Sequence, residues 1–157
     1  MSQVTRRNLM FGTLALAVTS PRIGLAQAAP AIHVLKDRNC GCCQAWIDIL
    51  IDEGFAVTTE NSYGALLVRH KVESGIPLEM VSCHTGEIDG YVIEGHVPPA
   101  DIRRLLSERP DAIGLAVPGM PYGSPGMGPE DRREAYDVFL IRHDGSTEVF
   151  TSYAAAA

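Results

Sequence analysis

Three of the four cysteines fall within four consecutive residues of the chain, Cys40-Gly41-Cys42-Cys43. The run follows a segment that alternates in character, Ala31–Lys36, and this alternation predicts a strand. Residues 43–53 then place apolar side chains at helical spacing, so the cysteines lie where a strand passes into a helix. Unpaired N–H groups at a helix N-terminus favour negative charge, and a thiol there ionises more readily. The position therefore favours thiolate chemistry, with sulfur acting as a nucleophile or as a metal ligand.

The rest of the pattern predicts an α/β fold of the thioredoxin-like class. The further elements expected are strand 55–60, helix 63–72, a hairpin of strands 80–87 and 90–94, and helix 100–108. This order is that of thioredoxin, a mixed sheet with flanking helices. The many Gly and Pro residues of 117–129 predict a long loop that also carries methionine, and a C-terminal β-hairpin of 134–141 and 147–153 is expected after it. A loop of this length in a compact domain is usually functional or disordered.

The N-terminal segment, residues 1–28, has the composition of an export signal. The pair Arg6-Arg7 precedes an uncharged stretch, residues 9–20, that is too short for a transmembrane helix of about 20 residues. An A-x-A site ends at Ala28, so we expect a signal peptide cleaved after that residue, of the twin-arginine type. An ordinary Sec signal with a chance arginine pair is the alternative. With either signal, we expect residues 29–157 to form a single periplasmic domain.

Charge limits the classes of partner. The formal net charge is −6, from 13 Lys and Arg against 19 Asp and Glu, and three of the basic residues (Arg6, Arg7 and Arg22) lie in the predicted signal. Phosphate binding needs clustered positive charge, so nucleic acid is not expected as a partner. No stable membrane insertion is expected either. The hydrophobic fraction of 46% is typical of a globular protein, which argues against wholesale disorder.

The cysteine run has three interpretations. Cys40 and Cys43 have the C-x-x-C spacing of a redox pair in a thioredoxin-like frame. The same pair could form a structural disulfide, because an exported protein meets an oxidising compartment. The third interpretation is a metal site. The neighbours Cys42 and Cys43 point about 100° apart on a helix, which suits bridging thiolates on separate ions better than one tetrahedral ion. Soft thiolates select Cu(I), and several monovalent ions neutralise four thiolates better than one Zn²⁺ does.

Further ligands are expected from segments that are remote in sequence. Cys83 lies on a strand expected beside the first strand, where it could approach the cysteine run, and His84 would then point to the opposite face unless the backbone bends. A satisfied or solvent-facing His84 is the alternative. Met120 and Met127 lie in the Gly/Pro loop, which has little core to fill, so they are candidate thioether ligands or else packing residues. His96 follows the predicted hairpin and could face the same site or serve a turn.

Five segments in order along residues 31–141 form a recognisable set. They are Cys40-Gly41-Cys42-Cys43, Ser82-Cys83-His84-Thr85, Gly90-Tyr91-Val92-Ile93-Glu94-Gly95-His96-Val97-Pro98, Gly114-Leu115-Ala116-Val117-Pro118-Gly119-Met120-Pro121 and Gly123-Ser124-Pro125-Gly126-Met127. In these segments the chain resembles the CopG-like family of periplasmic copper-resistance proteins. The resemblance implies a thioredoxin-like fold and a cysteine-bridged copper cluster held by the C-x-C-C run and the later cysteine. It also implies that copper changes between Cu(I) and Cu(II).

The leading hypothesis is a periplasmic copper-binding protein for copper resistance or homeostasis. A multinuclear Cu(I) thiolate cluster would be held by Cys40, Cys42, Cys43 and Cys83, with outer ligands from Met120, Met127, His84 and His96. Its partners would be copper ions and a periplasmic copper donor, acceptor or redox partner. The alternative is an enzyme, a thiol–disulfide oxidoreductase using Cys40 and Cys43; the extra Cys42 and the two loop methionines speak against it. A copper oxidoreductase lies between the two, and a zinc-stabilised or disulfide-stapled interaction domain is the third hypothesis, with zinc the weaker metal.

Overall fold

The computed structural model describes residues 28–157. The helices and strands are β1 (Ala31–Lys36), α1 (Gly41–Asp52), β2 (Ala56–Asn61), α2 (Ala65–Glu73), β3 (His84–Ile88), β4 (Tyr91–Glu94), α3 (Pro99–Glu108), β5 (Gly114–Ala116), β6 (Tyr136–Ile141) and β7 (Thr147–Tyr153), with 3₁₀ turns η1 (Leu78–Met80) and η2 (Glu130–Arg132). The predicted signal peptide, apart from Ala28, lies outside the described residues. Within residues 28–157, no helix has the length and apolar character needed to cross a membrane.

The seven strands of the described chain form one sheet in the order β2-β1-β3-β4-β5-β6-β7. Strand β1 runs parallel to β2 and antiparallel to β3, and β4 runs antiparallel to β3. Strand β5 is parallel to β4, while β6 and β7 form the predicted C-terminal hairpin at the far edge. The mixed α/β fold is therefore confirmed. The order β2-β1-β3-β4 with these directions is compatible with the thioredoxin-like class, and β5, β6 and β7 extend the sheet beyond it.

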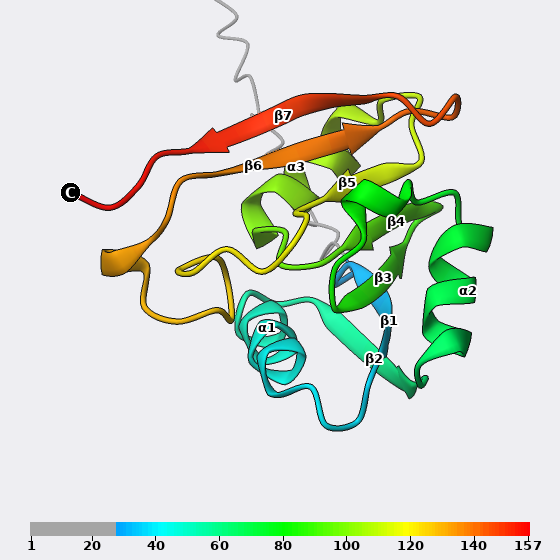
Figure 1. Cartoon of the computed structure of the whole chain (residues 1–157), viewed down its shortest axis with the longest axis horizontal. Helices are drawn as coiled ribbons and strands as arrows, with labels where there is room; N and C mark the ends of the chain where they lie inside the picture. The colour runs from blue at the N-terminus through cyan, green and yellow to red at the C-terminus, as the bar shows by residue number, and fades with distance from the viewer. Residues whose placement is uncertain (1–27) are drawn as a thin grey trace, which may run out of the picture.

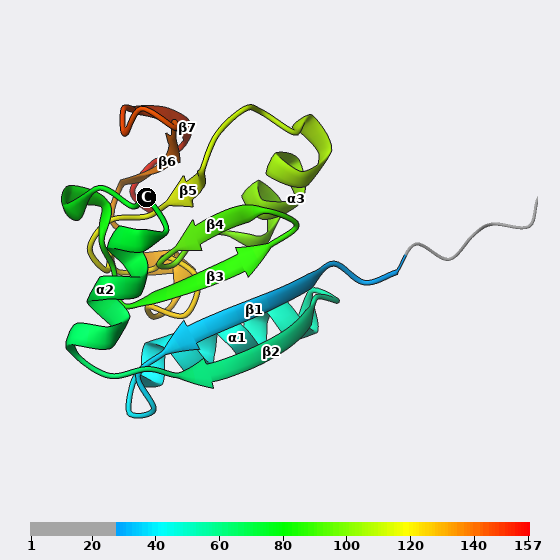
Figure 2. The same cartoon turned by 90° about the vertical axis from the view of Figure 1, so that its right-hand side faces the viewer.

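Helices cover both faces of the sheet. Helices α1 and α3 lie on one face and α2 lies on the other, as the two views show (Figures 1 and 2). The main core fills the space under α1 and α3 and includes the fully buried Trp46, Leu50, Ile93 and Ile102. On the other face a smaller cluster is formed by Ile76, Met80, Ala116 and Ile141. The prediction that Met80 belongs to the core is confirmed.

The side chain of Trp46 links α1 to the segment between β4 and α3. Its indole Nε1–H donates a hydrogen bond of 2.9 Å to the backbone carbonyl of Val97. Both residues are fully buried, so this bond satisfies two polar groups that water cannot reach. Gly54 follows α1 with φ at +83°, the left-handed conformation expected where a helix ends. These two features fix the direction of α1 over the sheet.

Strand β3 begins later than the sequence pattern predicts. Instead of a strand over residues 80–87, the chain forms η1 and three irregular residues, and β3 starts at His84. The backbone N–H of Ser82 donates to the carboxylate of Glu94 at 2.6 Å rather than to a neighbouring strand. Strand β5 is not predicted from the sequence. Its three residues are all buried, so they show no alternation of polar and apolar side chains. The other elements begin and end within two residues of their predicted bounds.

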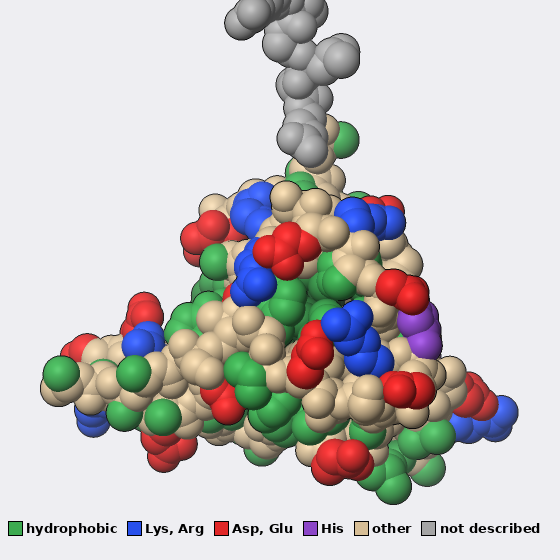
Figure 3. Space-filling view, turned by 90° about the horizontal axis from the view of Figure 1, so that it is seen from above, with side chains coloured by type: hydrophobic (Ala, Val, Ile, Leu, Met, Phe, Trp, Pro, Cys, Tyr) green, Lys and Arg blue, Asp and Glu red, His purple; other side chains and the backbone are tan. Residues whose placement is uncertain are grey.

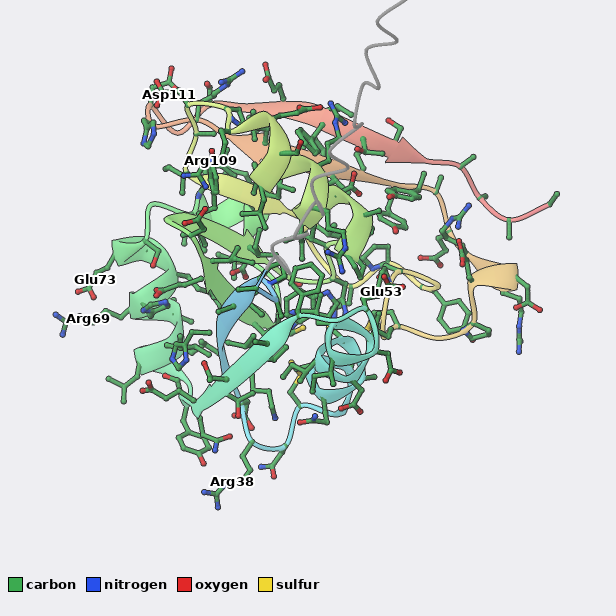
Figure 4. All side chains as sticks on the ribbon, turned by 180° about the vertical axis from the view of Figure 1, so that it is seen from behind. Arg38, Glu53, Arg69, Glu73, Arg109 and Asp111 are labelled. Atoms are coloured by element: carbon green, nitrogen blue, oxygen red, sulfur yellow. A yellow bond between two sulfur atoms is a disulfide. The ribbon has the colours of Figure 1, made fainter. Side chains whose placement is uncertain are left out.

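Charged side chains on the surface pair with one another. On the face drawn in Figure 3, Lys and Arg side chains are interspersed with Asp and Glu rather than gathered into one patch. Arg69 and Glu73 form such a pair on α2, with 2.6 Å between Nε and Oε1, and both project from the outer side of the helix (Figure 4). Exposed pairs of this kind contribute little to stability.

A buried ion pair, in contrast, docks α2 on the sheet. Lys71 is 2% exposed and Glu94 is fully buried, and Lys71 Nζ donates to Glu94 Oε1 at 2.7 Å. Lys71 also donates to Thr85 Oγ1 at 2.8 Å, and that hydroxyl donates to Glu94 Oε2 at 2.7 Å. Burial raises the pKa of the Glu94 carboxyl, and the ammonium of Lys71 opposes that shift. Each charge depends on the other, because an unpaired charge at this depth is strongly destabilising.

We predict that Lys71→Met lowers the free energy of unfolding by about 3–5 kcal/mol at pH 7, because it leaves Glu94 buried without its cation. In this variant the folded-state pKa of Glu94 rises further above its unfolded value of about 4.3. The free energy of unfolding lost through Glu94 therefore grows as pH rises above the unfolded-state pKa. The destabilisation of the variant should shrink as pH falls towards that pKa. Urea unfolding followed by Trp46 fluorescence measures both effects. Arg69→Met, which breaks the exposed pair, is the matched control, and equal stability of the two variants at pH 7 contradicts the prediction.

Candidate metal centre

The cysteine run forms the N-terminus of α1. Cys40 is the N-cap residue, and its Sγ accepts a hydrogen bond from the backbone N–H of Cys43 at 3.3 Å. Helix α1 therefore begins two residues before the predicted start, and Gly41, Cys42 and Cys43 form its first turn. A disulfide joins Cys40 to Cys43, whereas Cys42 and Cys83 are free thiols. The structure thus shows the C-x-x-C pair in its oxidised form.

The fourth cysteine lies beside the other three. Cys42 Sγ is 3.5 Å from Cys40 Sγ and 4.0 Å from Cys83 Sγ. Cys43 Sγ is 3.8 Å from the backbone carbonyl oxygen of Cys83. All four sulfur atoms lie within 4.8 Å of one another. Because β1 and β3 are neighbours in the sheet, the end of β1 and the residue before β3 meet at one edge, which is the juxtaposition that the sequence predicts.

Two histidines contact the sulfur of Cys83. His84 Nδ1 lies 3.2 Å from Cys83 Sγ, and His96 Nε2 lies 3.1 Å from the same sulfur. Cys83 precedes β3, so the backbone is not extended there and His84 need not point away from Cys83, as it would on a regular strand. The His84 and His96 rings meet edge to face with centroids 5.0 Å apart, and Trp46 packs on His84 at 4.3 Å. The structure therefore brings both predicted histidines to the cysteine cluster.

Burial favours the uncharged form of these three groups. Burial lowers the pKa of His84 well below its usual value, and nearby His96 and Lys71 lower it further. The pKa of His96 is lowered by burial as well. Burial, followed by the proximity of Cys42, raises the pKa of the Cys83 thiol to about 12. Neutral imidazole is the form that binds metal ions, and a bound cation would displace the proton of Cys83.

The loop between β5 and β6 passes beside α1 (Figure 1) and contacts both segments that carry the cysteines. At Gly126, with φ at +83°, an added Cβ would lie 2.7 Å from Trp46 N and 2.9 Å from the backbone oxygen of Cys42. Met127 follows this contact and is half-buried. Earlier in the loop, the backbone carbonyl of Gly119 accepts a hydrogen bond of 2.5 Å from Ser82 Oγ. Met120 comes directly after it and is 54% exposed, so the structure brings the loop segments that carry both methionines next to the cysteine segments and encloses neither side chain.

Residues outside the predicted set hold Cys83 in position. The Glu94 carboxylate binds the N–H of Ser82 and the hydroxyl of Thr85, the residues that flank the Cys83–His84 pair. Gly95 has φ at +71°, and an added Cβ would lie 2.6 Å from Ser82 Cβ. Glu94 could have been noticed as a charged residue that ends an apolar strand. Lys71 gives no such signal, because lysine is common on the solvent-exposed side of a helix.

This donor set suits soft and borderline metal ions. Thiolates and thioethers favour Cu(I), and imidazole suits Zn²⁺ and both oxidation states of copper. The chain also supplies the support that metal-binding histidines usually have, since His96 Nδ1 is 2.8 Å from the carbonyl oxygen of Pro125. With Cys40 and Cys43 joined, the thiols of Cys42 and Cys83 and the two imidazoles are available. Reduction of the disulfide would add two further sulfur ligands.

Comparison with known proteins gives one family model and two solved structures. Residues 80–127 match a family described as proteins of unknown function, DUF411. The chain is 48% identical to the copper resistance protein copG in its form 1 structure, with a TM-score of 0.75, covering 81% of this chain and 99% of that one. For the form 2 structure of copG, identity is 49% and the TM-score 0.73, covering 80% and 98% of the two chains. Curated protein sequences gave no match.

We predict that Gly126→Ala destabilises the protein more than Gly119→Ala. Both glycines have positive φ, so alanine at either position costs about 1 kcal/mol in backbone conformation. Only at Gly126 would the new Cβ also meet the first turn of α1, which adds about 1–3 kcal/mol of overpacking, whereas nothing lies within 4 Å of a Cβ at Gly119. Urea unfolding of the two variants measures the difference. Equal losses of stability would show that the loop does not pack against the cysteine run.

Proposed function

The chain belongs to the family of the copper resistance protein copG, and on this basis we propose that it binds copper in the bacterial periplasm for copper resistance or homeostasis. The observation that carries the proposal is the convergence of Cys40, Cys42, Cys43 and Cys83, whose sulfur atoms lie within 4.8 Å of one another. Affinity for copper must come from these sulfur atoms, because exposed carboxylates attract cations only weakly. Copper is the cargo of this site.

The cargo is proposed to be a multinuclear Cu(I) thiolate cluster. Cys42 and Cys43 are adjacent in the first turn of α1, so they reach the cluster from directions about 100° apart around the helix axis, which suits bridging between separate ions. Four thiolates require the Cys40–Cys43 disulfide to be reduced, which takes two electrons and two protons from a periplasmic dithiol. Four thiolates carry four negative charges. One divalent ion would neutralise only two of them, whereas several Cu(I) ions can neutralise all four. Zinc is the weaker candidate for the same reason.

Histidine and methionine are proposed as the outer ligands. His84 and His96 already touch Cys83, and the loop that carries Met120 and Met127 packs on both cysteine segments. The exposed position of Met120 suits a ligand that meets copper as it enters or leaves, through a periplasmic donor or acceptor. We also propose that copper changes between Cu(I) and Cu(II) here, with a periplasmic redox partner exchanging one electron for each ion.

One observation favours a second function. The Cys40–Cys43 disulfide and the N-cap position of Cys40 are features of a thiol–disulfide oxidoreductase, in which the reduced pair would pass two electrons to a substrate disulfide. Cys42 lies 3.5 Å from Cys40 and could divert this pair into a wrong disulfide. Binding of copper is therefore preferred as the main role, with oxidoreductase activity as the alternative.

The proposed location follows from the N-terminal segment. Residues 1–28 have the pattern of a signal peptide, and residues 29–157 are proposed to form the single exported domain. The pair Arg6-Arg7 favours the twin-arginine route, which carries folded proteins. A folded domain could therefore cross the membrane with its cysteine cluster already assembled.

We predict that the fully reduced mature protein binds more than one Cu(I) per chain in an anaerobic titration, and that Cys42→Ser loses at least one of these ions. The affinity should fall as pH falls, because binding displaces thiol protons, including that of Cys83. Metal analysis and free-thiol counting give the stoichiometry. Met80→Leu is the matched control, since it removes a buried sulfur on the opposite face of the sheet and should leave the stoichiometry unchanged.

Two outcomes would contradict the copper proposal. Binding of a single Zn²⁺ in preference to Cu(I) would favour a structural metal site. Insulin reduction that is as fast in Cys42→Ser as in the unmodified protein, together with weak Cu(I) binding, would favour the oxidoreductase.

For export, we predict that an Arg6→Lys and Arg7→Lys double variant accumulates with its signal uncleaved in the cytoplasm, because the twin-arginine route reads that pair. Cell fractionation followed by N-terminal sequencing measures the outcome, and periplasmic protein should begin at Ala29. Arg22→Lys is the control and should be exported normally. Normal export of the double variant would instead assign the signal to the Sec route.

A further inference from the structure

Helix α2 and its flanks expose a group of apolar side chains to solvent. Of the nine large apolar side chains that are exposed within residues 28–157, five lie between residues 63 and 78: Tyr63, Leu66, Val68, Val72 and Leu78. Single apolar residues on a surface need no explanation, whereas a group of them on one element marks a site of interaction. The helix forms the right-hand edge of the molecule in Figure 1, where a second molecule can reach it.

The orientation of α2 on the sheet leaves these side chains outside. The inward side of the helix buries Leu67 and Lys71, and the ammonium of Lys71 is held there by the ion pair described above. Leu66, Val68 and Val72 point outwards, with exposed fractions of 67%, 48% and 52%. An aliphatic side chain in water gains no hydrophobic stabilisation, so α2 retains apolar area that another surface can bury.

We propose that the outer side of α2 is a self-association surface, on which the α2 helices of two copies of this chain pack antiparallel about a two-fold axis. The argument for a second copy, rather than another partner, is the arrangement of apolar and charged side chains along the helix. This inference goes beyond the proposed function and does not depend on copper.

Two stripes of side chains run side by side along the outer side of α2, because successive residues of a helix are turned by about 100°. Val68 and Val72, four residues apart, form an apolar stripe. Arg69 and Glu73 form a charged stripe beside it, and both project away from the body of the molecule (Figure 4). The apolar stripe has its midpoint at residue 70 and the charged stripe at residue 71, so the two midpoints lie about 1.5 Å apart along the helix.

A single two-fold axis near these midpoints satisfies both stripes. When a second α2 packs antiparallel across this axis, the valine stripe meets its own copy, and Arg69 of each chain lies opposite Glu73 of the other. A surface that is complementary to itself in this way is what an isologous dimer requires. A membrane surface would instead favour clustered basic residues, whereas this stripe carries one charge of each sign.

The size of the surface predicts a weak dimer. Helix α2 has nine residues, a length of about 14 Å, whereas a standard interface buries about 800 Å² on each partner. Tyr63 and Leu78, which are exposed just before and just after the helix, can enlarge the contact. The cysteine run begins α1, on the opposite face of the sheet from α2 (Figure 2), so a second copy docked on α2 leaves the run uncovered.

Sedimentation equilibrium of the mature protein tests the apolar stripe. A reductant is present, so that the free thiols of Cys42 and Cys83 cannot link two chains. We expect a monomer–dimer equilibrium between about 1 µM and 1 mM protein, the range of weak complexes. Val72→Lys should raise the dimer dissociation constant at least about tenfold, because it places a charge in the centre of the contact. Ile51→Lys is the matched control: Ile51 is also 52% exposed and near the end of a helix, but it lies on α1.

Charge reversal tests the two-fold arrangement. Arg69→Glu and Glu73→Arg each place like charges opposite one another in a homodimer, so each variant alone should dimerise more weakly than the unmodified protein. An equimolar mixture of the two variants should associate more tightly than either alone, because opposite charges then meet at both contacts. The double variant Arg69→Glu and Glu73→Arg should also dimerise, since it exchanges the signs within one chain and restores both pairs across the axis.

Three results would overturn the proposal: a monomer over the whole concentration range, a dimer that Val72→Lys does not weaken, or a mixture of the charge variants that associates no better than either alone. A monomer that binds vesicles of anionic phospholipid would assign the outer side of α2 to a membrane surface instead. Circular dichroism establishes that each variant is folded. Cu(I) stoichiometry per chain should be the same in Val72→Lys as in the unmodified protein, so failure of the dimer and failure of the copper proposal give different results.

Discussion

The geometry of the candidate metal centre depends on the contacts of the Glu94 carboxylate. It lies at the end of β4, fully buried, and it is held there by the ammonium of Lys71 from α2. One of its oxygens also accepts the backbone N–H of Ser82, which draws the chain out of the sheet just before β3. Cys83 therefore lies in a bend rather than on a strand, and its sulfur can face the cysteine run and both histidines. A buried charge pair has little net effect on stability when compared with apolar packing, so its value here is better understood as fixing one backbone conformation.

At this edge, the two faces of the sheet carry different groups of side chains. Towards α2, Thr85 and Glu94 belong to the polar network that sets the backbone. Towards α1, His84 packs on Trp46, and the indole in turn binds Val97 just after His96. Adjacent residues of β3 thus belong to the positioning network on one face and to the candidate metal centre on the other, because successive side chains of a strand point to opposite faces. The loop after β5 completes the enclosure, because Gly126 allows it to approach α1 and Pro125 then binds the ring of His96.

Much of this arrangement can be predicted from the sequence, for identifiable reasons. The cysteine run lies between a strand and a helix that both have clear periodicity, and the neighbouring positions of β1 and β3 follow from the order of the elements, so the meeting of Cys83 with the run is foreseeable. Helix starts shift by a turn or less, because Cys40 caps α1 with its sulfur and cysteine is an unusual cap. The bend at residues 81–83 is not foreseeable, because it depends on a carboxylate more than ten residues away. Lys71 is missed for the same reason, since its burial is decided by tertiary contacts that no local pattern records.

The charge state of the cysteine–histidine cluster bears on the proposed uptake of copper. Burial favours the neutral form of both imidazoles and the protonated form of the Cys83 thiol, so these three side chains carry little charge in a poorly solvated place. A cation that enters must release protons, and the free energy of that release opposes binding. The preference for a soft ion follows, because only a strong metal–sulfur bond overcomes this opposition. The Cys40–Cys43 disulfide occupies two of the four clustered sulfur atoms, so the oxidation state of this pair sets how many thiols the cluster can offer to a soft ion.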